Sequence, residues 1–373
     1  MTGEKTNLRE LAGLFTKLGL TAFGGPAAHI AMMKKEVVDK RQWMDNQHFL
    51  DLIGATNLIP GPNSTEMAIH IGHERGGWKG LLVAGCCFII PAVLITGVIA
   101  WLYQLYGQLP QVRPFIYGIK PAIIAIILAA IFPLAKKAFK TKELVVLGIL
   151  ALGISLTGFN EIVVLFGAGL VSLLFYIGRR PGTTLKSYFA ALLLDIPFFS
   201  EANVRLFLIF LKIGAILYGS GYVLFAFLDS ELVARGLLSR LQLVDAIAVG
   251  QFTPGPVFSS VTFIGWQISG LPGAAMATVA VFLPSFVFVA LLNPLVPRMR
   301  RSALFSAFLD GVNAASVAII VTVCITFARE TVTDWRTILI ALLSLVVTFG
   351  FRKVNTVWVV MGSALLGSVL SMV

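Results

Sequence analysis

The chain has 373 residues, of which 57% are hydrophobic and only 13% charged, and its formal net charge is +11 at pH 7. Soluble domains carry about 25% charged residues, so this composition excludes an ordinary soluble enzyme or binding module. The basic residues form short clusters between long apolar runs, which indicates orientation in a lipid bilayer rather than a nucleic-acid partner.

The first expected helix, residues 8–23, ends at a glycine-rich break at residues 24–26. After a polar stretch, two short apolar segments, 46–58 and 63–74, flank a Pro-Gly-Pro sequence at residues 60–62. Each segment is too short to cross a hydrocarbon core of ~30 Å at ~1.5 Å per residue. We therefore expect a re-entrant hairpin of two half-helices.

Two long helices, 78–104 and 113–136, and a tight helical pair, 143–157 and 160–178, complete this half of the chain. Long apolar runs of this kind predict transmembrane helices. The half therefore contains five expected crossings in addition to the hairpin.

The second half repeats this plan. FTKLGLTAFGG (15–25) aligns with FLKIGAILYGS (210–220), and IPGP (59–62) aligns with TPGP (253–256), in each case about 194 residues further along. Matching helices are expected at 205–218, 242–252, 257–269, 272–293, 302–328, 337–350 and 355–373. This pattern predicts a tandem duplication. Its parts are a first repeat in residues 1–185, a linker in 186–204 and a second repeat in 205–373.

An odd number of crossings in each repeat would place the two repeats in opposite orientations. Strong basic clusters lie at 34–41 and 136–142 in the first repeat but at 298–301 and 352–353 in the second, which are opposite ends of the repeated helices. The sequence therefore predicts an all-α polytopic membrane protein. Its two homologous halves are in inverted topology, each with about five crossings plus a broken re-entrant helical hairpin.

The two Pro-Gly-Pro sequences are expected to act as structural breaks. Proline lacks an N–H group and glycine adopts backbone angles that other residues avoid, so each sequence ends one half-helix and starts another. Bare backbone groups are tolerated at membrane depth where they line a protected cavity, as in secondary transporters built from inverted repeats. The break residues are Pro60, Gly61, Pro62, Pro254, Gly255 and Pro256.

Residues beside the breaks predict the charge of a substrate. Free N–H groups at a helix N-terminus favour anions, and hydroxyl groups add hydrogen-bond donors. Kinks that serve only small-residue packing are the alternative. The predicted donors are Gly24, Gly25, Asn63, Ser64, Thr65, Gly219, Ser220, Ser259 and Ser260.

Lys17 and Lys212 occupy the same position in the two repeats, seven residues before a glycine break. A lysine within a membrane helix is costly, so this matched pair predicts cations that neutralise a bound dianion. The alternative is that each lysine reaches out to the membrane interface.

Ionisable residues also follow the first break. Glu66 and His70 are one helical turn apart, a spacing that suits proton exchange and equally suits a helix emerging at the membrane surface. His70 and His73 lack a clear third ligand, so we expect no metal site. Asp245 and Lys120 are expected to add polar lining, matched in the other repeat by Asp51 and Asn313. No catalytic or nucleotide-binding pattern is present, so we expect neither an enzyme nor a cofactor.

Three stretches carry a family resemblance: FGGPAAHIAMM (23–33), GPNSTEMAIHIGHERGGWKGLLVAGCCFIIPA (61–92), and QFTPGPVF with FIGWQISGLPGAAMATVAVFLPSF (within 251–286). They resemble the chromate ion transporter (CHR) family, and the length is similar to that of its long-chain members, in which two homologous domains are fused. The resemblance implies export of chromate across the cell (inner) membrane, driven by the proton-motive force, and chromate resistance.

Several alternatives remain open at the level of sequence. Sulfate is a tetrahedral dianion of similar size, so transport of sulfate or another oxyanion, in either direction, fits the same residues. A passive anion channel and a non-transporting scaffold or lipid-modifying enzyme are further alternatives. The glycine-rich face at 167–178 suits packing within one chain and also a homodimer.

Overall fold

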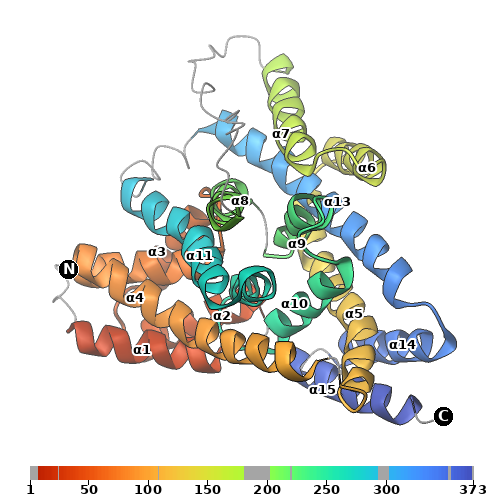
Figure 1. Cartoon of the computed structure of the whole chain (residues 1–373). Helices are drawn as coiled ribbons and strands as arrows, with labels where there is room; N and C mark the ends of the chain where they lie inside the picture. The colour runs from red at the N-terminus through yellow and green to blue at the C-terminus, as the bar shows by residue number, and fades with distance from the viewer. Residues whose placement is uncertain are drawn as a thin grey trace.

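The computed structural model describes residues 7–23, 25–107, 109–179, 202–218, 221–292, 302–351 and 354–371. These residues form helices joined by short connections (Figure 1). The first repeat contains α1 (Leu8–Thr21), α2 (Gly25–Lys34), the π-helix η1 (Lys35–Lys40), α3 (Asn46–Thr56), α4 (Asn63–Tyr106), α5 (Arg113–Ala138), α6 (Lys142–Leu156) and α7 (Glu161–Gly178).

The second repeat follows the same order. Its elements are α8 (Ala202–Ile216), α9 (Val223–Leu228), the π-helix η2 (Asp229–Val233), α10 (Arg240–Phe252), the short 3₁₀-helix η3 (Val257–Ser259), α11 (Ser260–Leu292), α13 (Ala303–Thr331), α14 (Trp335–Gly350) and α15 (Thr356–Leu370). The all-α class and the duplicated plan predicted from the sequence are confirmed.

The half-helices before the two breaks begin with matching caps. The side chain of Asp45 accepts a hydrogen bond from the His48 N–H group at the start of α3. Ser239 caps α10 at the equivalent position, in a reciprocal arrangement with the Gln242 side chain. Such caps satisfy N–H groups that have no partner within the helix, so both half-helices start at a defined residue.

A glycine kink separates each second half-helix from the long helix after it. Gly77 has φ 57° and ψ −145° within α4, and Gly270 has φ 60° and ψ −150° within α11. These angles suit glycine and interrupt a regular helix. The sequence predicts separate helices on either side of these residues, and the non-helical backbone at Gly77, Ser269 and Gly270 separates them in the structure.

Among the described residues, five helical segments are long and apolar enough to cross a membrane: Asn63–Tyr106, Arg113–Ala138, Glu161–Gly178, Val257–Leu291 and Ala303–Thr331. α14 and α15 are shorter apolar helices. Large apolar side chains are exposed on the outward faces of these helices and of α6, for example Leu94, Ile149, Leu174, Leu291 and Leu365. Such a surface suits contact with lipid, so this is a multi-pass membrane protein.

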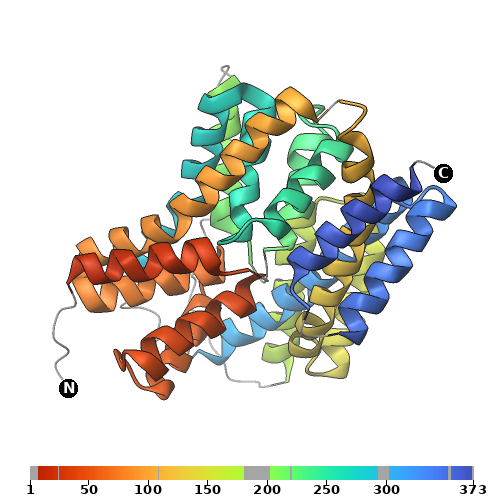
Figure 2. The same ribbon diagram turned by 90° about the horizontal axis from the view of Figure 1, so that it is seen from below.

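The terminal helix pair of each repeat packs on the other repeat. α14 and α15 pack against α5, and α6 and α7 pack against α13 (Figures 1 and 2). Gly118 of α5 and Gly311 of α13 occupy matching positions and bring the helices together. A Cβ atom at Gly118 would strike the Ser363 carbonyl of α15, and one at Gly311 would strike the Ala168 carbonyl of α7. This reciprocal exchange is the arrangement expected of two repeats in inverted topology.

Candidate functional site

Each Pro-Gly-Pro break donates a backbone hydrogen bond to the other repeat. The Gly61 N–H group donates to the Leu217 carbonyl at 2.7 Å, just past the end of α8. The Gly255 N–H group donates to the Ala22 carbonyl at 2.8 Å, just past the end of α1. These two N–H groups are therefore occupied by protein, and each break is attached to the first helix of the other repeat.

Each break also packs closely against the long helix of the other repeat, α11 for the first break and α4 for the second. Gly61 has φ 137° and Gly255 has φ 86°. A Cβ atom at Gly61 would collide with the Glu66 carboxyl and with the Ser285 hydroxyl of α11. One at Gly255 would lie 2.8 Å from the Ala92 Cβ atom of α4. The breaks thus lie at the interface between the two repeats.

Residues after the first break form the first turn of α4. Ser64 and Thr65 are buried, and the Ser64 hydroxyl lies 3.3 Å from the His29 Nδ1 atom of α2. The Asn63 side chain donates to the Asn57 side chain at 2.8 Å. No side chain caps the start of α4.

Residues after the second break are also buried. The Ser259 hydroxyl lies 3.4 Å from the Thr96 hydroxyl of α4, while the Ser260 hydroxyl has no partner among the described residues. Gly25 begins α2 with φ 80° and lies close to the Tyr222 hydroxyl. Three further predicted donors lie outside the described residues: Gly24, Gly219 and Ser220.

Buried polar atoms without a hydrogen-bond partner gather beside the breaks. Within the described part of the chain, such atoms belong to Thr65, Glu66, His70, Gln251, Ser260 and Ser285. Thr65, Glu66 and His70 follow the first break on α4, Gln251 precedes the second break, and Ser260 follows it. Ser285 adjoins Gly61. An unpaired buried polar group is costly, so a cluster of them indicates a place that receives a polar guest.

The ionisable members of this cluster come from one repeat. Glu66 and His70 are fully buried and lie one turn apart on α4. The equivalent residues on α11 are Ser260 and Ile264. An ionised carboxylate that is buried beside a single hydroxyl group, that of Ser285, is costly, so Glu66 is suited to take up a proton in this arrangement.

Sequence reasoning missed three polar residues beside the breaks. His29 is buried next to Ser64, Gln251 lies three residues before Pro254, and Ser285 adjoins Gly61. His29 stands within the FGGPAAHIAMM stretch, so its sequence context carried a signal. Ser285 lies in an apolar helix, far from the break in sequence, and only the fold brings it there.

Lys17 and Lys212 are each paired with a glutamate of their own repeat. The Lys17 Nζ atom lies 3.3 Å from Glu36, and the Lys212 Nζ atom lies 3.1 Å from Glu231. The lysine side chains are 58% and 36% exposed, respectively. The structure does not bring them into the buried cluster beside the breaks, and it gives each ammonium group a carboxylate partner.

These two pairs, called here the Lys–Glu clamps, are duplicated in detail. Each glutamate lies within a π-helix and is buried. Glu36 also binds Lys40 at 2.8 Å and Arg41, and Glu231 also binds Arg235 at 2.7 Å. Hydrogen bonds from Lys40, Arg41 and Lys17 hold the pKa of Glu36 down at about 2. The clamps therefore fasten the first helix of each repeat to the amphipathic segment after it.

The first clamp predicts a specific loss of stability in acid. The pKa of Glu36 is lowered by folding, so its contribution is fully present above the ordinary value of 4.5 and is lost as the pH falls towards about 2. We expect Glu36→Gln to lower the unfolding temperature in detergent at pH 7 by a few degrees and to flatten its decline between these pH values. Glu74→Gln, which removes a carboxylate bonded to His48, is the control. Parallel pH profiles for wild type and Glu36→Gln would contradict this role.

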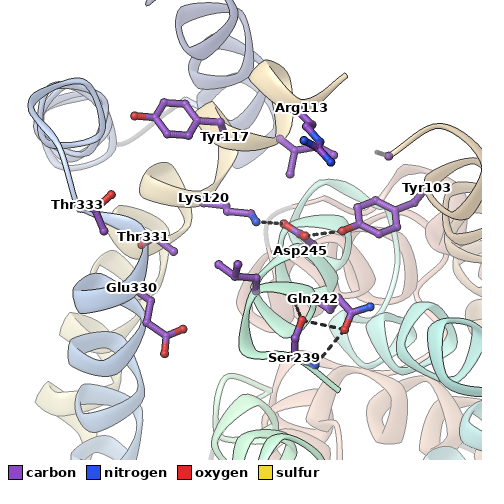
Figure 3. Close-up of a pocket in the computed structure, with 13 residues that line it drawn as sticks. Tyr103, Arg113, Tyr117, Lys120, Ser239, Gln242, Asp245, Glu330, Thr331 and Thr333 are labelled. Carbon is purple, nitrogen blue, oxygen red and sulfur yellow. Dashed lines mark hydrogen bonds and ion pairs between the residues drawn. The ribbon is translucent and has the colours of Figure 1, made fainter. Parts of the chain in front are cut away.

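A separate polar pocket of about 620 Å³ lies between the ends of four helices (Figure 3). Its floor carries an ion pair between Lys120 of α5 and Asp245 of α10, with 3.1 Å between the charged atoms. The Tyr103 hydroxyl of α4 donates to the same carboxylate at 2.7 Å. The sequence predicts polar lining at both charged residues but not their contact with each other. Their equivalents, Asp51 and Asn313, are half-buried, and Asp51 accepts a hydrogen bond from Gln47.

The described residues contain no group of three or more His, Cys, Asp or Glu side chains that could hold a metal ion.

Comparisons with known proteins agree with the duplicated plan. The sequence model of a family described as chromate transporter matches twice, at residues 9–173 and 204–368. A chromate transport protein of Cupriavidus metallidurans is 32% identical over 99% of this chain and 94% of its own length. One from Pseudomonas aeruginosa is 28% identical over 96% of this chain and 91% of its own length. No solved structure matches the chain.

Proposed function

The chain belongs to the chromate transporter family, and we propose that it is a secondary active transporter that exports chromate from the cytoplasm, driven by the proton-motive force. It is a transport protein of a membrane rather than an enzyme. The observation that carries the proposal is the cluster of buried, unpaired polar atoms at the two breaks, between the two repeats.

The proposed substrate site uses donors from both repeats. Thr65 of α4 and Ser260 of α11 stand in the first turns after the breaks, and Gln251 and Ser285 add donors from the second repeat. Hydroxyl and amide groups can donate to the four oxygens of a tetrahedral dianion. The N-terminal end of α4 adds the positive end of a helix dipole.

Hydrogen bonds from the same hydroxyl groups would replace those that the dianion makes with water in solution. Each unpaired donor in the cluster would gain a charge-assisted hydrogen bond when the substrate binds. Ser64 and Ser259 are engaged by His29 and Thr96, so they would support the site or exchange partners during binding.

Proton coupling is assigned in this proposal to Glu66 and His70. Both are buried in the cluster, and the Glu66 carboxyl lies beside the Ser285 hydroxyl at Gly61. A carboxyl and an imidazole one helical turn apart form a pair that can take up and pass on a proton. Because the Glu66 carboxyl adjoins Gly61, a change in its charge would change the electrostatic environment of the first break.

The experiment is flux measured in proteoliposomes that contain the purified protein. We expect chromate to move through the wild type, faster when a pH gradient is imposed than without one, and faster than in liposomes lacking protein. Competition by sulfate distinguishes a chromate transporter from a general oxyanion transporter. Flux that ignores the pH gradient but follows the membrane voltage would indicate a passive anion channel instead. No flux under any gradient would contradict the proposal.

The same liposomes test whether Lys17 and Lys212 act on the substrate. If the two lysines contact the substrate directly, Lys17→Ala and Lys212→Ala should each raise the KM for chromate while the protein stays folded. The Lys–Glu clamps favour a different outcome, in which each variant melts at a lower temperature and the KM stays within about twofold of wild type. We expect the second outcome.

A further inference from the structure

The polar pocket is built from both repeats. Its lining comes from the ends of α4 and α5 in the first repeat and from the ends of α10 and α13 in the second. Figure 3 shows Lys120 and Asp245 pointing toward each other at one side of the open space. At about 620 Å³, the pocket is large enough for a small oxyanion together with several water molecules, each of which takes up about 30 Å³.

Besides Arg113, the charged residues that line the pocket belong to two groups. Glu330 is held by Arg240 at 2.6 Å, and Arg240 also binds Asp229 at 2.8 Å. Lys120 binds Asp245, and its side chain is only 17% exposed. The Tyr103 hydroxyl binds the same carboxylate. A nearly buried ammonium group therefore faces the cavity with a carboxylate as its partner.

α10 connects this pocket to the second break. Asp245 stands seven residues before Phe252, the last residue of α10, a distance of about 10 Å along a helix axis. The Pro-Gly-Pro sequence begins after one further residue, Thr253, and Gln251 of the buried cluster lies on the same helix. An anion in the pocket would therefore be one short helix away from the proposed substrate site.

We propose that the pocket is a second oxyanion site, at which the substrate replaces Asp245 as the partner of Lys120 on its way to or from the breaks. This inference rests on the proposed function and extends it to residues outside the breaks. Tetrahedral dianions such as chromate and sulfate are the ligands, because they can accept hydrogen bonds from an ammonium group and from hydroxyl groups at once.

The exchange gives the two charged residues opposite effects on binding. Lys120 attracts the anion, so its loss weakens binding. Asp245 competes with the anion for Lys120, so neutralising it strengthens binding. The Tyr103 hydroxyl, which donates to Asp245 in this structure, can donate to the anion once the carboxylate has moved.

The test is chromate binding to the purified protein in nanodiscs, with flux measured in parallel. Lys120→Gln should weaken binding by about tenfold or more, and Lys120→Arg should restore most of it. Asp245→Asn should tighten binding by about threefold or more while slowing turnover, because the anion leaves less readily. Melting temperatures show whether each variant is folded.

A matched control is offered by Lys140 and Asp310, which also form an ion pair between the repeats, at 2.6 Å, but away from the pocket. Lys140→Gln and Asp310→Asn should bind chromate as the wild type does. The inference is overturned if Lys120→Gln binds like Lys140→Gln, or if Asp245→Asn weakens binding as Lys120→Gln does. Wild-type flux with such results would leave the proposed function intact. Binding differences without wild-type flux would contradict the proposed function but not the oxyanion site, and no chromate binding by the wild type would contradict the oxyanion site.

Discussion

Gly255→Ala is expected to abolish transport and to destabilise the folded protein by about 2–5 kcal/mol. Gly255 has φ 86°, a region in which a residue with a side chain is strained. The added methyl group would lie 2.8 Å from the Ala92 Cβ atom and 3.0 Å from the Gly19 carbonyl oxygen, neither of which is the end of a flexible side chain. The bond from the Gly255 N–H group to Ala22 would be lost or distorted.

The measurement is the unfolding temperature in detergent, with chromate flux in proteoliposomes made from whatever folded protein remains. Gly97→Ala is the matched control, because Gly97 lies in regular helix within α4 and an added Cβ atom would meet nothing within 4 Å. That variant should be neutral or slightly stabilised. If Gly255→Ala melts and transports as Gly97→Ala does, the break is not a close contact between the repeats.

Glu66→Gln is expected to reduce chromate transport driven by a pH gradient to the level of liposomes without protein. The glutamine keeps the size of the side chain but cannot take up or release a proton. Because the proposed substrate donors Thr65, Ser260 and Ser285 remain, we expect exchange of chromate for chromate, with no pH gradient, to persist.

The measurement compares chromate transport driven by a pH gradient with chromate–chromate exchange in the same liposomes. Glu74→Gln is the control on the same helix, since Glu74 is partly exposed and bonded to His48 at 2.8 Å, away from the breaks. It should retain both activities. Full proton-driven transport by Glu66→Gln would remove Glu66 from the coupling mechanism, and loss of both activities would assign it to substrate binding or folding instead.

The helices flanking the breaks could be predicted closely from the sequence. Length limits, the Pro-Gly-Pro sequences and the glycines after them carry local information, and the structure places α3, α4, α10 and α11 where this information indicates. The segments η1 and η2 could not be predicted beyond their polarity. A π-helix has a weak sequence signature, and the lysines that Glu36 and Glu231 contact lie in the first helix of each repeat, outside these segments.

The candidate site was predicted in part. Thr65, Glu66, His70 and Ser260 were recognised because they follow the breaks directly in sequence. Gln251 and Ser285 join them through packing between repeats, which no local pattern reveals. The duplication indicates a shared role for Lys17 and Lys212, but it does not predict that each pairs with a glutamate of its own repeat. The contact of Lys120 with Asp245 joins residues far apart in the chain and depends entirely on how α5 and α10 meet.

The exchange of terminal helix pairs between the repeats has a consequence for biogenesis. When α5 enters the membrane during synthesis, α14 and α15, which will cover it, have not yet been made, and α6 and α7 have no α13 to pack against. The surface of α5 around Gly118, which α15 covers in the finished protein, therefore stays without its partner helix until the end of the chain has been synthesised. Within one chain, neither half covers these surfaces by itself, so a product that ended after α7 would leave α5, α6 and α7 without the helices that cover them here.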